Sequence, residues 1–144
     1  MKISFDTNIV VHACNHASPV QPVAVQFLES LALRSDVVVS EFILVELYLK
    51  LRNGKIFPDP MTAPEAAAVC QAFRSNAHWE LTSDAPIMDE VWKRAKKEDF
   101  AIRRIVDLRL GLSLVRHGVS EFATANTKDF SDVGFARVWN PLAL

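Results

Sequence analysis

The sequence predicts an α/β fold with a mainly parallel central sheet of four to five strands flanked by helices. The chain has 144 residues, half of them apolar, which is enough for one domain with its own core. Short apolar runs alternate with segments of helical periodicity, a pattern typical of parallel strands joined by helical crossovers. We therefore expect residues 1–144 to form a single domain with its functional side chains just after the strands.

Five short segments rich in β-branched or aromatic residues are predicted to be strands. Asp6-Thr7-Asn8 directly follows the first of them, and its polar side chains predict a turn. The predicted strands are 3–5, 37–39, 79–82, 122–124 and 136–139.

Five longer segments are predicted to be helices, and most of them have a recognisable start or stop. Ser40 is placed to cap the second helix, the pair Thr62 and Glu65 forms a capping-box pattern at the third, and Gly118 ends the fifth. The predicted helices are 23–33, 41–53, 62–75, 84–97 and 104–117.

The charge is distributed unevenly along the chain. Residues 1–92 contain six Lys or Arg and eleven Asp or Glu, whereas residues 93–116 contain eight basic and three acidic residues. The basic segment is either an electrostatic footprint for a polyanion or a solvated helical face. Its basic residues are Lys93, Arg94, Lys96, Lys97, Arg103, Arg104, Arg109 and Arg116.

Several function classes are excluded by composition and spacing. No apolar run approaches the roughly 20 residues of a membrane helix, and the N-terminus does not resemble a signal peptide. Cys14 and Cys70 lack the spacing of a zinc site, so we expect reduced thiols in a cytoplasmic protein that does not contact membranes. His12 and His16 have i, i+4 spacing, but His16 falls in a predicted loop, which disfavours a soft-metal site.

Three acidic residues occupy positions where a charged carboxylate is unfavourable unless it is paired, capped or bound to a metal. Asp6 follows the first strand, Glu46 interrupts an apolar helix, and Asp107 lies among aliphatic residues near a helix start. Each has a structural alternative: a turn or helix cap for Asp6, a salt bridge with Lys50 or Arg52 for Glu46, and favourable charge at a helix N-terminus for Asp107.

The turn after the fourth predicted strand adds two more polar candidates, Asn126 and Asp129, whose alternative is the chemistry of the loop itself. In a crossover fold these side chains converge with the three acids. Carboxylate and amide oxygens are hard ligands that suit Mg²⁺ or Mn²⁺, while the absence of paired cysteines and of an HExxH motif disfavours zinc. A site of this kind usually serves phosphate chemistry.

Four fragments in this order resemble the PIN domain, above all the VapC-type toxins of type II toxin–antitoxin systems, and the resemblance covers nearly the whole chain. The fragments are Phe5-Asp6-Thr7-Asn8, residues 40–46, Asp107-Leu108-Arg109-Leu110, and residues 123–130. The resemblance implies a PIN-like fold and Mg²⁺- or Mn²⁺-dependent cleavage of RNA by metal-activated water. It also implies that the protein binds a cognate antitoxin and forms a homodimer.

Carried over residue by residue, the resemblance assigns metal binding to Asp6, Glu46 and Asp107. Many family members have an acid where this chain has Asn126, so the fourth position falls to Asn126 or to Asp129. The residues expected to hold flanking phosphates of the substrate are Arg103, Arg104 and Arg109.

Two other functions stay open at this point. One is a metal-dependent phosphatase or phosphotransferase of another α/β superfamily, although Asp6-Thr7-Asn8 lacks the second acid of a DxD motif. The other is a catalytically silent PIN-like binding module, which the neutral Asn126 keeps possible.

Overall fold

The structure is a computed structural model that describes residues 1–82, 86–101 and 104–143. The strands are β1 (Lys2–Phe5), β2 (Val38–Ser40), β3 (Glu80–Thr82), β4 (Val119–Ala123) and β5 (Arg137–Trp139). The helices are α1 (Thr7–Cys14), α2 (Gln21–Leu31), α3 (Glu41–Leu51), α4 (Ala63–Arg74), α5 (Met88–Ala95), α6 (Arg104–Arg116) and the short 3₁₀ helix η1 (Thr127–Phe130).

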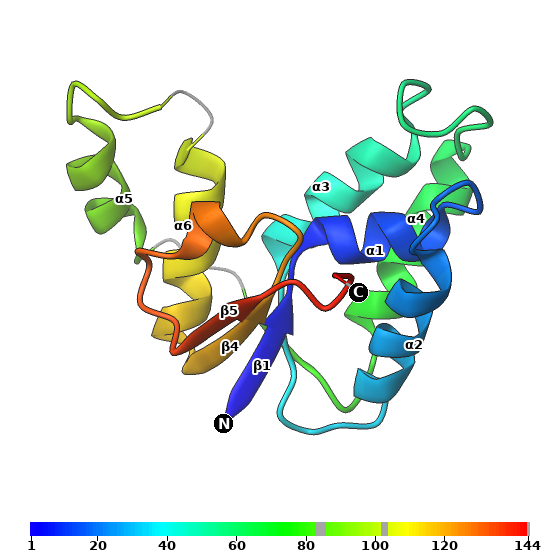
Figure 1. Cartoon of the computed structure of the whole chain (residues 1–144), viewed down its shortest axis with the longest axis horizontal. Coiled ribbons are helices and arrows are strands. Elements are labelled where there is room, and N and C mark those ends of the chain that lie inside the picture. Colours follow the sequence, from blue (N-terminus) through cyan, green and yellow to red (C-terminus); the bar gives the residue numbers. More distant parts are fainter. Residues whose placement is uncertain (83–85, 102–103, 144) are drawn as a thin grey trace.

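All the strand pairs are parallel, as the alternation of strands and helices predicts. β1, β4 and β5 form one sheet, with β4 in the middle (Figure 1). β2 pairs with β3 in a second sheet. A parallel bridge between Ile3 and Val37 connects them, and the Ile3 amide donates to the Asp36 carbonyl at 2.9 Å. Through this bridge the strand order becomes β3-β2-β1-β4-β5, with β1 at the centre.

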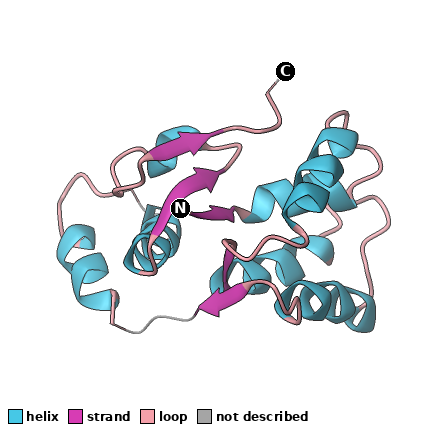
Figure 2. Cartoon of the chain, turned by 90° about the horizontal axis from the view of Figure 1, so that it is seen from below, coloured by secondary structure: helices cyan, strands magenta, loops and turns pink. Residues whose placement is uncertain are grey.

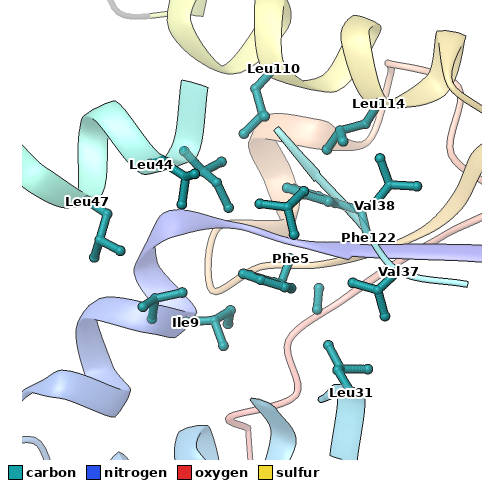
Figure 3. Close-up of a cluster of buried hydrophobic side chains, with 14 of the residues drawn as sticks. Phe5, Ile9, Leu31, Val37, Val38, Leu44, Leu47, Leu110, Leu114 and Phe122 are labelled. Atoms are coloured by element: carbon teal, nitrogen blue, oxygen red, sulfur yellow. The ribbon is translucent and has the colours of Figure 1, made fainter. Parts of the chain in front are cut away.

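The hydrophobic core lies where the central strands meet the helices on both sides. Phe5 of β1 and Phe122 of β4 are fully buried, and aliphatic side chains from α1, α3 and α6 surround them (Figure 3). Burying each large side chain stabilises the fold by about 1.5–3 kcal/mol. This core fixes the strand ends, from which the candidate site residues project.

Two helix starts confirm the capping predictions. The Ser40 hydroxyl accepts a 3.1 Å hydrogen bond from the Phe42 amide at the start of α3. At α4, the Thr62 hydroxyl accepts from the Glu65 amide, and the Glu65 carboxylate accepts from the Thr62 amide. Local side-chain chemistry therefore sets both boundaries.

The N-terminal turn prediction is wrong, because Asp6-Thr7-Asn8 begins helix α1. Asp6 is the N-cap, and Ile9 and Val10 bury one face of the helix. Thr, Ile and Val have weak helix propensity, so packing against α2 and α3 stabilises this helix more than its own sequence does. The fourth strand also differs from its prediction: it spans Val119–Ala123 and starts directly after Gly118, whose φ of +83° ends the preceding helical turn.

Helix α5 packs against α6 and lies away from α1–α4, on the other side of the molecule (Figures 1 and 2). Ile87 and Val91 are buried at this contact but do not belong to the main core cluster. Asp84, which is predicted to open this helix, lies outside the described residues. In the described part of the chain, no helix combines the length and apolarity needed to cross a bilayer.

Candidate active site

Asp6 lies at the carboxyl end of β1 and is only 6% exposed. Its Oδ1 atom accepts a 2.7 Å hydrogen bond from the Thr7 amide as the N-cap of α1. Its Oδ2 atom accepts from the Thr124 hydroxyl at 2.8 Å. Burial raises the pKa of Asp6, these hydrogen bonds oppose the rise, and the nearby Glu46 charge adds to it. The cap proposed as an alternative role for Asp6 is therefore real, and it leaves the carboxylate beside the other acids.

Thr124 and Asn8 link the end of β4 to the start of α1. The Thr124 hydroxyl also accepts from the Asn126 amide at 3.0 Å, and the Asn8 side-chain oxygen accepts from the Ala125 amide at 3.2 Å. The sequence places Asn8 in a predicted turn and predicts neither of these hydrogen bonds. The signal for them was present, because Thr124 directly follows β4, Asn8 lies three residues after β1, and the parallel sheet aligns the ends of these two strands.

Glu46 projects from α3 towards the same region. Its Oε2 atom accepts a 3.4 Å hydrogen bond from the Thr7 hydroxyl. Its Oε1 atom is buried and has no hydrogen-bond partner among the described residues. Burial raises the pKa of Glu46, Lys50 counteracts this, and Asp107 adds to it.

The salt-bridge alternative for Glu46 is not formed. Among the described residues, no ion pair joins Glu46 to Lys50 or Arg52, although Lys50 is near enough to act through its charge. Arg52 donates instead to the Tyr48 hydroxyl at 3.0 Å. A half-buried carboxylate with one unpartnered oxygen is a poor structural element and a good cation ligand.

Asp107 lies in the first turn of α6, as the sequence predicts. Burial, together with the charges of Asp6 and Asp129, raises its pKa to about 6 against the opposing charge of Arg104. Asp6, Glu46 and Asp107 therefore come from three separate elements, and each lies within electrostatic range of another. The fold brings the three predicted acids together.

The two candidates for the fourth position lie differently. Asp129 lines a small pocket of about 150 Å³ together with Asp107, Ala101 and Arg104. Asn126 is exposed and forms the N-cap of η1, with no side-chain capping bond in that described segment. The geometry thus places Asp129, rather than Asn126, beside the acids.

Packing against α6 holds the segment that carries Asp129. Phe130 is fully buried, with its ring centroid 4.7 Å from that of Phe122. Gly111 of α6 allows Val133 to approach so closely that an added Cβ would lie 2.7 Å from a Val133 methyl carbon. The position of Asp129 is therefore set by the core as well as by its loop.

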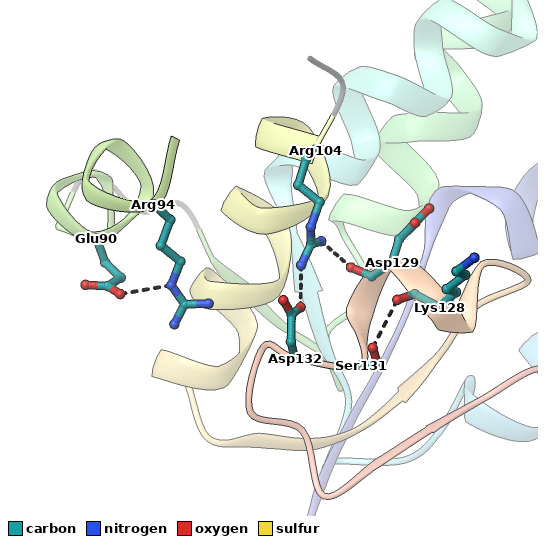
Figure 4. Close-up of polar contacts among 7 residues, drawn as sticks. All are labelled: Glu90, Arg94, Arg104, Lys128, Asp129, Ser131 and Asp132. Atoms are coloured by element: carbon teal, nitrogen blue, oxygen red, sulfur yellow. Dashed lines mark hydrogen bonds and ion pairs between the residues drawn. The ribbon is translucent and has the colours of Figure 1, made fainter. Parts of the chain in front are cut away.

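The three predicted phosphate-binding arginines have different surroundings. The Arg104 guanidinium contacts the Asp129 carbonyl and the Asp132 carboxylate, while the Asp129 carboxylate points away from it (Figure 4). The Arg109 guanidinium lies 3.8 Å from the centroid of the Phe42 ring, a cation–π contact. Arg103 lies outside the described residues.

The donor set fits a divalent cation in its chemistry. Among the residues that the structure describes, no three His, Cys, Asp or Glu side chains are already close enough together to hold a metal ion. The three acids are nevertheless desolvated, repel one another and include the unpartnered Glu46 oxygen, all of which a bound cation would relieve. His12 and His16 do not face each other: they contact Ser18 and Gln21 respectively.

Comparisons with known proteins identify relatives of the chain and solved structures that share its fold. No protein-family model matches the sequence. The chain is 49% identical over 140 residues to the ribonuclease VapC24 of two Mycobacterium tuberculosis strains, and the match covers 97% of both chains.

Solved structures share the fold at lower identity. One is VapC20 of Mycobacterium tuberculosis, a sarcin-ricin loop cleaving toxin, with a TM-score of 0.69 and 19% identity over 93% of this chain and 96% of that one. FitAcB from Neisseria gonorrhoeae has a TM-score of 0.64 and 20% identity over 99% of both chains. FitAB bound to a DNA fragment has a TM-score of 0.62 and 19% identity over 99% of this chain and 96% of that one.

The parallel sheet, the acids gathered at its carboxyl edge and the near full-length match to VapC24 lead to one assignment. The chain belongs to the VapC family of PIN-domain ribonucleases.

Proposed function

We propose that the chain is a toxin endoribonuclease that cleaves RNA phosphodiester bonds with Mg²⁺ or Mn²⁺ held by Asp6, Glu46 and Asp107. The observation that carries this proposal is the convergence of three carboxylates whose pKa values are all raised by burial and by one another. Such a cluster is unfavourable in isolation and becomes favourable when a cation neutralises it.

A divalent ion at this site would lower the pKa of a bound water and offset the charge that develops at the phosphate. The protein's own residues have distinct tasks. Thr124 and the Thr7 amide orient the Asp6 carboxylate, and the Thr7 hydroxyl orients Glu46. We propose Asp129 as the fourth acid, since it shares a pocket with Asp107, and Asn126 as a residue that shapes the turn.

The proposed assemblies follow from the family and the surface. The similarity to toxin–antitoxin proteins supports a cognate antitoxin as partner. A homodimer is supported by Val45 and Leu49, which lie one turn apart on α3 with 60% and 63% of their surface exposed. Light scattering of the purified chain, alone and with its antitoxin, tests both assemblies. We further propose that residues 1–144 form one domain located in the cytoplasm.

The decisive assay compares two substrates with the same enzyme. Purified protein is given a fluorophore-quenched RNA or a chromogenic phosphomonoester, each with Mn²⁺, with Mg²⁺ or with EDTA. We expect metal-dependent release of fluorescence and no phosphomonoester hydrolysis. Hydrolysis of the phosphomonoester instead would support the phosphatase alternative, and inactivity on both substrates would support a silent binding module.

A further inference from the structure

A second cleft lies next to the acidic pocket, between α5, α6 and the loop after η1. It has a volume of about 190 Å³ and is lined by Arg94, Lys97, Phe100, Arg104 and Asp132. We refer to these five residues as the basic cleft. Three of them are cationic and one is an acid, so the cleft carries net positive charge beside a strongly negative site.

Arg104 belongs to both cavities. It lines the pocket that contains Asp107 and Asp129, and it also lines the basic cleft. The Arg104 side chain therefore separates two adjacent cavities. The consecutive residues Phe100 and Ala101 line the basic cleft and the acidic pocket respectively. A ligand that occupies the acidic pocket can extend directly into the basic cleft.

Two of the three cations of the basic cleft, Arg94 and Arg104, are held in ion pairs. Arg94 pairs with Glu90 at 2.9 Å, and Arg104 pairs with Asp132 (Figure 4). In these pairs the carboxylates are 45% and 67% exposed. Exposed pairs of this kind contribute little to stability. A phosphate can therefore replace Glu90 at the Arg94 guanidinium, whereas Arg104 is only 20% exposed and is also held by the Asp129 carbonyl.

Phe100 indicates which class of anionic ligand fits the basic cleft, a nucleic acid or an acidic protein segment. It is half-buried and lies in the wall of the cleft among the cations. An aromatic ring beside basic side chains is the combination that binds single-stranded nucleic acid, because bases stack on the ring while cations contact phosphates. The carboxylates of an acidic protein segment would interact with the cations only, so the aromatic ring favours a nucleic acid.

We propose that the basic cleft holds the RNA strand next to the scissile phosphate, with Arg94 and Lys97 on a neighbouring phosphate and Phe100 against a base. This inference rests on the proposed ribonuclease function and adds the direction in which the substrate leaves the acidic pocket. It also moves most of the expected phosphate contacts away from Arg109, whose guanidinium is already placed over the Phe42 ring.

The test measures RNA binding in EDTA, which separates it from catalysis. A short fluorescein-labelled single-stranded RNA of mixed sequence is titrated with wild type, Arg94→Gln, Lys97→Gln and Phe100→Leu over a series of salt concentrations. The matched control is Lys55→Gln, because Lys55 is exposed and lies in the loop between α3 and α4, on the opposite side of the molecule from α5 (Figure 1).

We expect Arg94→Gln and Lys97→Gln each to weaken binding about 3- to 10-fold at low salt and to reduce the slope of log affinity against log salt by about 0.7. Phe100→Leu should weaken binding without changing the slope, because stacking releases no counterions. Lys55→Gln should bind as wild type does. Lys97 is exposed, so its variant keeps the test valid even if Phe100→Leu fails to fold.

The inference is wrong if the Arg94 and Lys97 variants match Lys55→Gln in both affinity and slope. It is also wrong if these variants lose affinity for a polyglutamate peptide while RNA binding stays unchanged, since the cleft would then serve an acidic protein. A wild type that binds RNA through the cleft but does not cleave it would remove the proposed activity and leave this inference standing. If wild type cleaves RNA and the variants bind RNA normally, the proposed activity stands and the inference about the basic cleft fails.

Discussion

The Thr124 hydroxyl donates a 2.8 Å hydrogen bond to Oδ2 of Asp6, and this contact joins the end of β4 to the end of β1. Both residues are almost completely buried. The same hydroxyl accepts from the Asn126 amide, so one side chain positions the first acid of the site and the turn that leads to η1.

Thr124→Val should weaken the fold and the site together. The buried Asp6 Oδ2 atom loses its 2.8 Å donor and keeps only the longer 3.4 Å contact from the Asn8 side-chain amide, and the Asn126 amide loses its acceptor. Together these losses cost about 1–3 kcal/mol in the free energy of unfolding. Urea denaturation measures this loss. Thr124→Ser keeps the hydroxyl and should retain most of the stability and the RNA cleavage. A valine variant as stable as wild type would show that the hydrogen bonds of the Thr124 hydroxyl do not stabilise the fold.

Asp6→Asn should abolish metal-dependent RNA cleavage, by about a hundredfold or more, in a protein that still folds. Asparagine caps helices as well as aspartate does, so α1 keeps its start while the site loses one negative charge. Cleavage of quenched RNA and circular dichroism provide the two measurements. Unchanged cleavage by the pure variant would rule out Asp6 as a metal ligand.

The sequence predicts the fold class and the converging acids because both depend on local patterns. Alternation of strands and helices, the Ser40 cap and the Thr62–Glu65 capping box can all be recognised in the sequence alone. Helix α1 could not be predicted in this way, because its β-branched residues favour other conformations and its stability comes from Ile9 and Val10 in the core. The same limit applies to the basic segment, where only packing distinguishes Arg109 over Phe42 from the cations of the basic cleft.

The stability of the metal-free protein should fall as the pH rises from about 4 to about 6. Burial and the nearby acids raise the pKa of Asp107 from 3.8 to about 6, so its contribution to stability is fully present below the usual value and is lost as the pH passes through the raised one. Melting temperatures in EDTA across this range measure the effect. Asp107→Asn should show a flatter profile, and equal slopes for both proteins would contradict the raised pKa.

Glu46→Gln should lose cleavage by about a hundredfold and melt at a higher temperature than wild type in EDTA. Neutralising Glu46 removes its repulsion with Asp107 and the desolvation cost of a half-buried charge. The matched control is Glu41→Gln on the same helix, which loses the 2.8 Å ion pair with Arg74 and should melt at the same or a slightly lower temperature. A lower melting temperature for Glu46→Gln would favour a structural role.

Asp129→Asn should weaken Mn²⁺ binding about 10- to 100-fold in titration calorimetry, because Asp129 shares its pocket and its electrostatic field with Asp107. Asn126→Ala should change the affinity little, since Asn126 does not line the pocket that holds Asp107 and Asp129. Asp132→Asn, on the far side of Arg104, is the charge-matched control. The opposite order, with Asn126→Ala abolishing binding and Asp129→Asn neutral, would assign the fourth position to Asn126.

The bridge between Ile3 and Val37 connects two separately paired groups of strands, and the proposed metal site depends on how these groups stay together. Asp6 follows β1 in one group, whereas Glu46 belongs to the helix that begins directly after β2 in the other. Along this seam the two acids are held in register by side-chain packing of α1 on α3 and by the Thr7 hydroxyl, which contacts both Glu46 and the Ile43 carbonyl. A protein that bound α1 or α3 and moved these two helices apart would separate the Asp6 and Glu46 carboxylates. It would thereby inhibit the enzyme without contacting the proposed metal site.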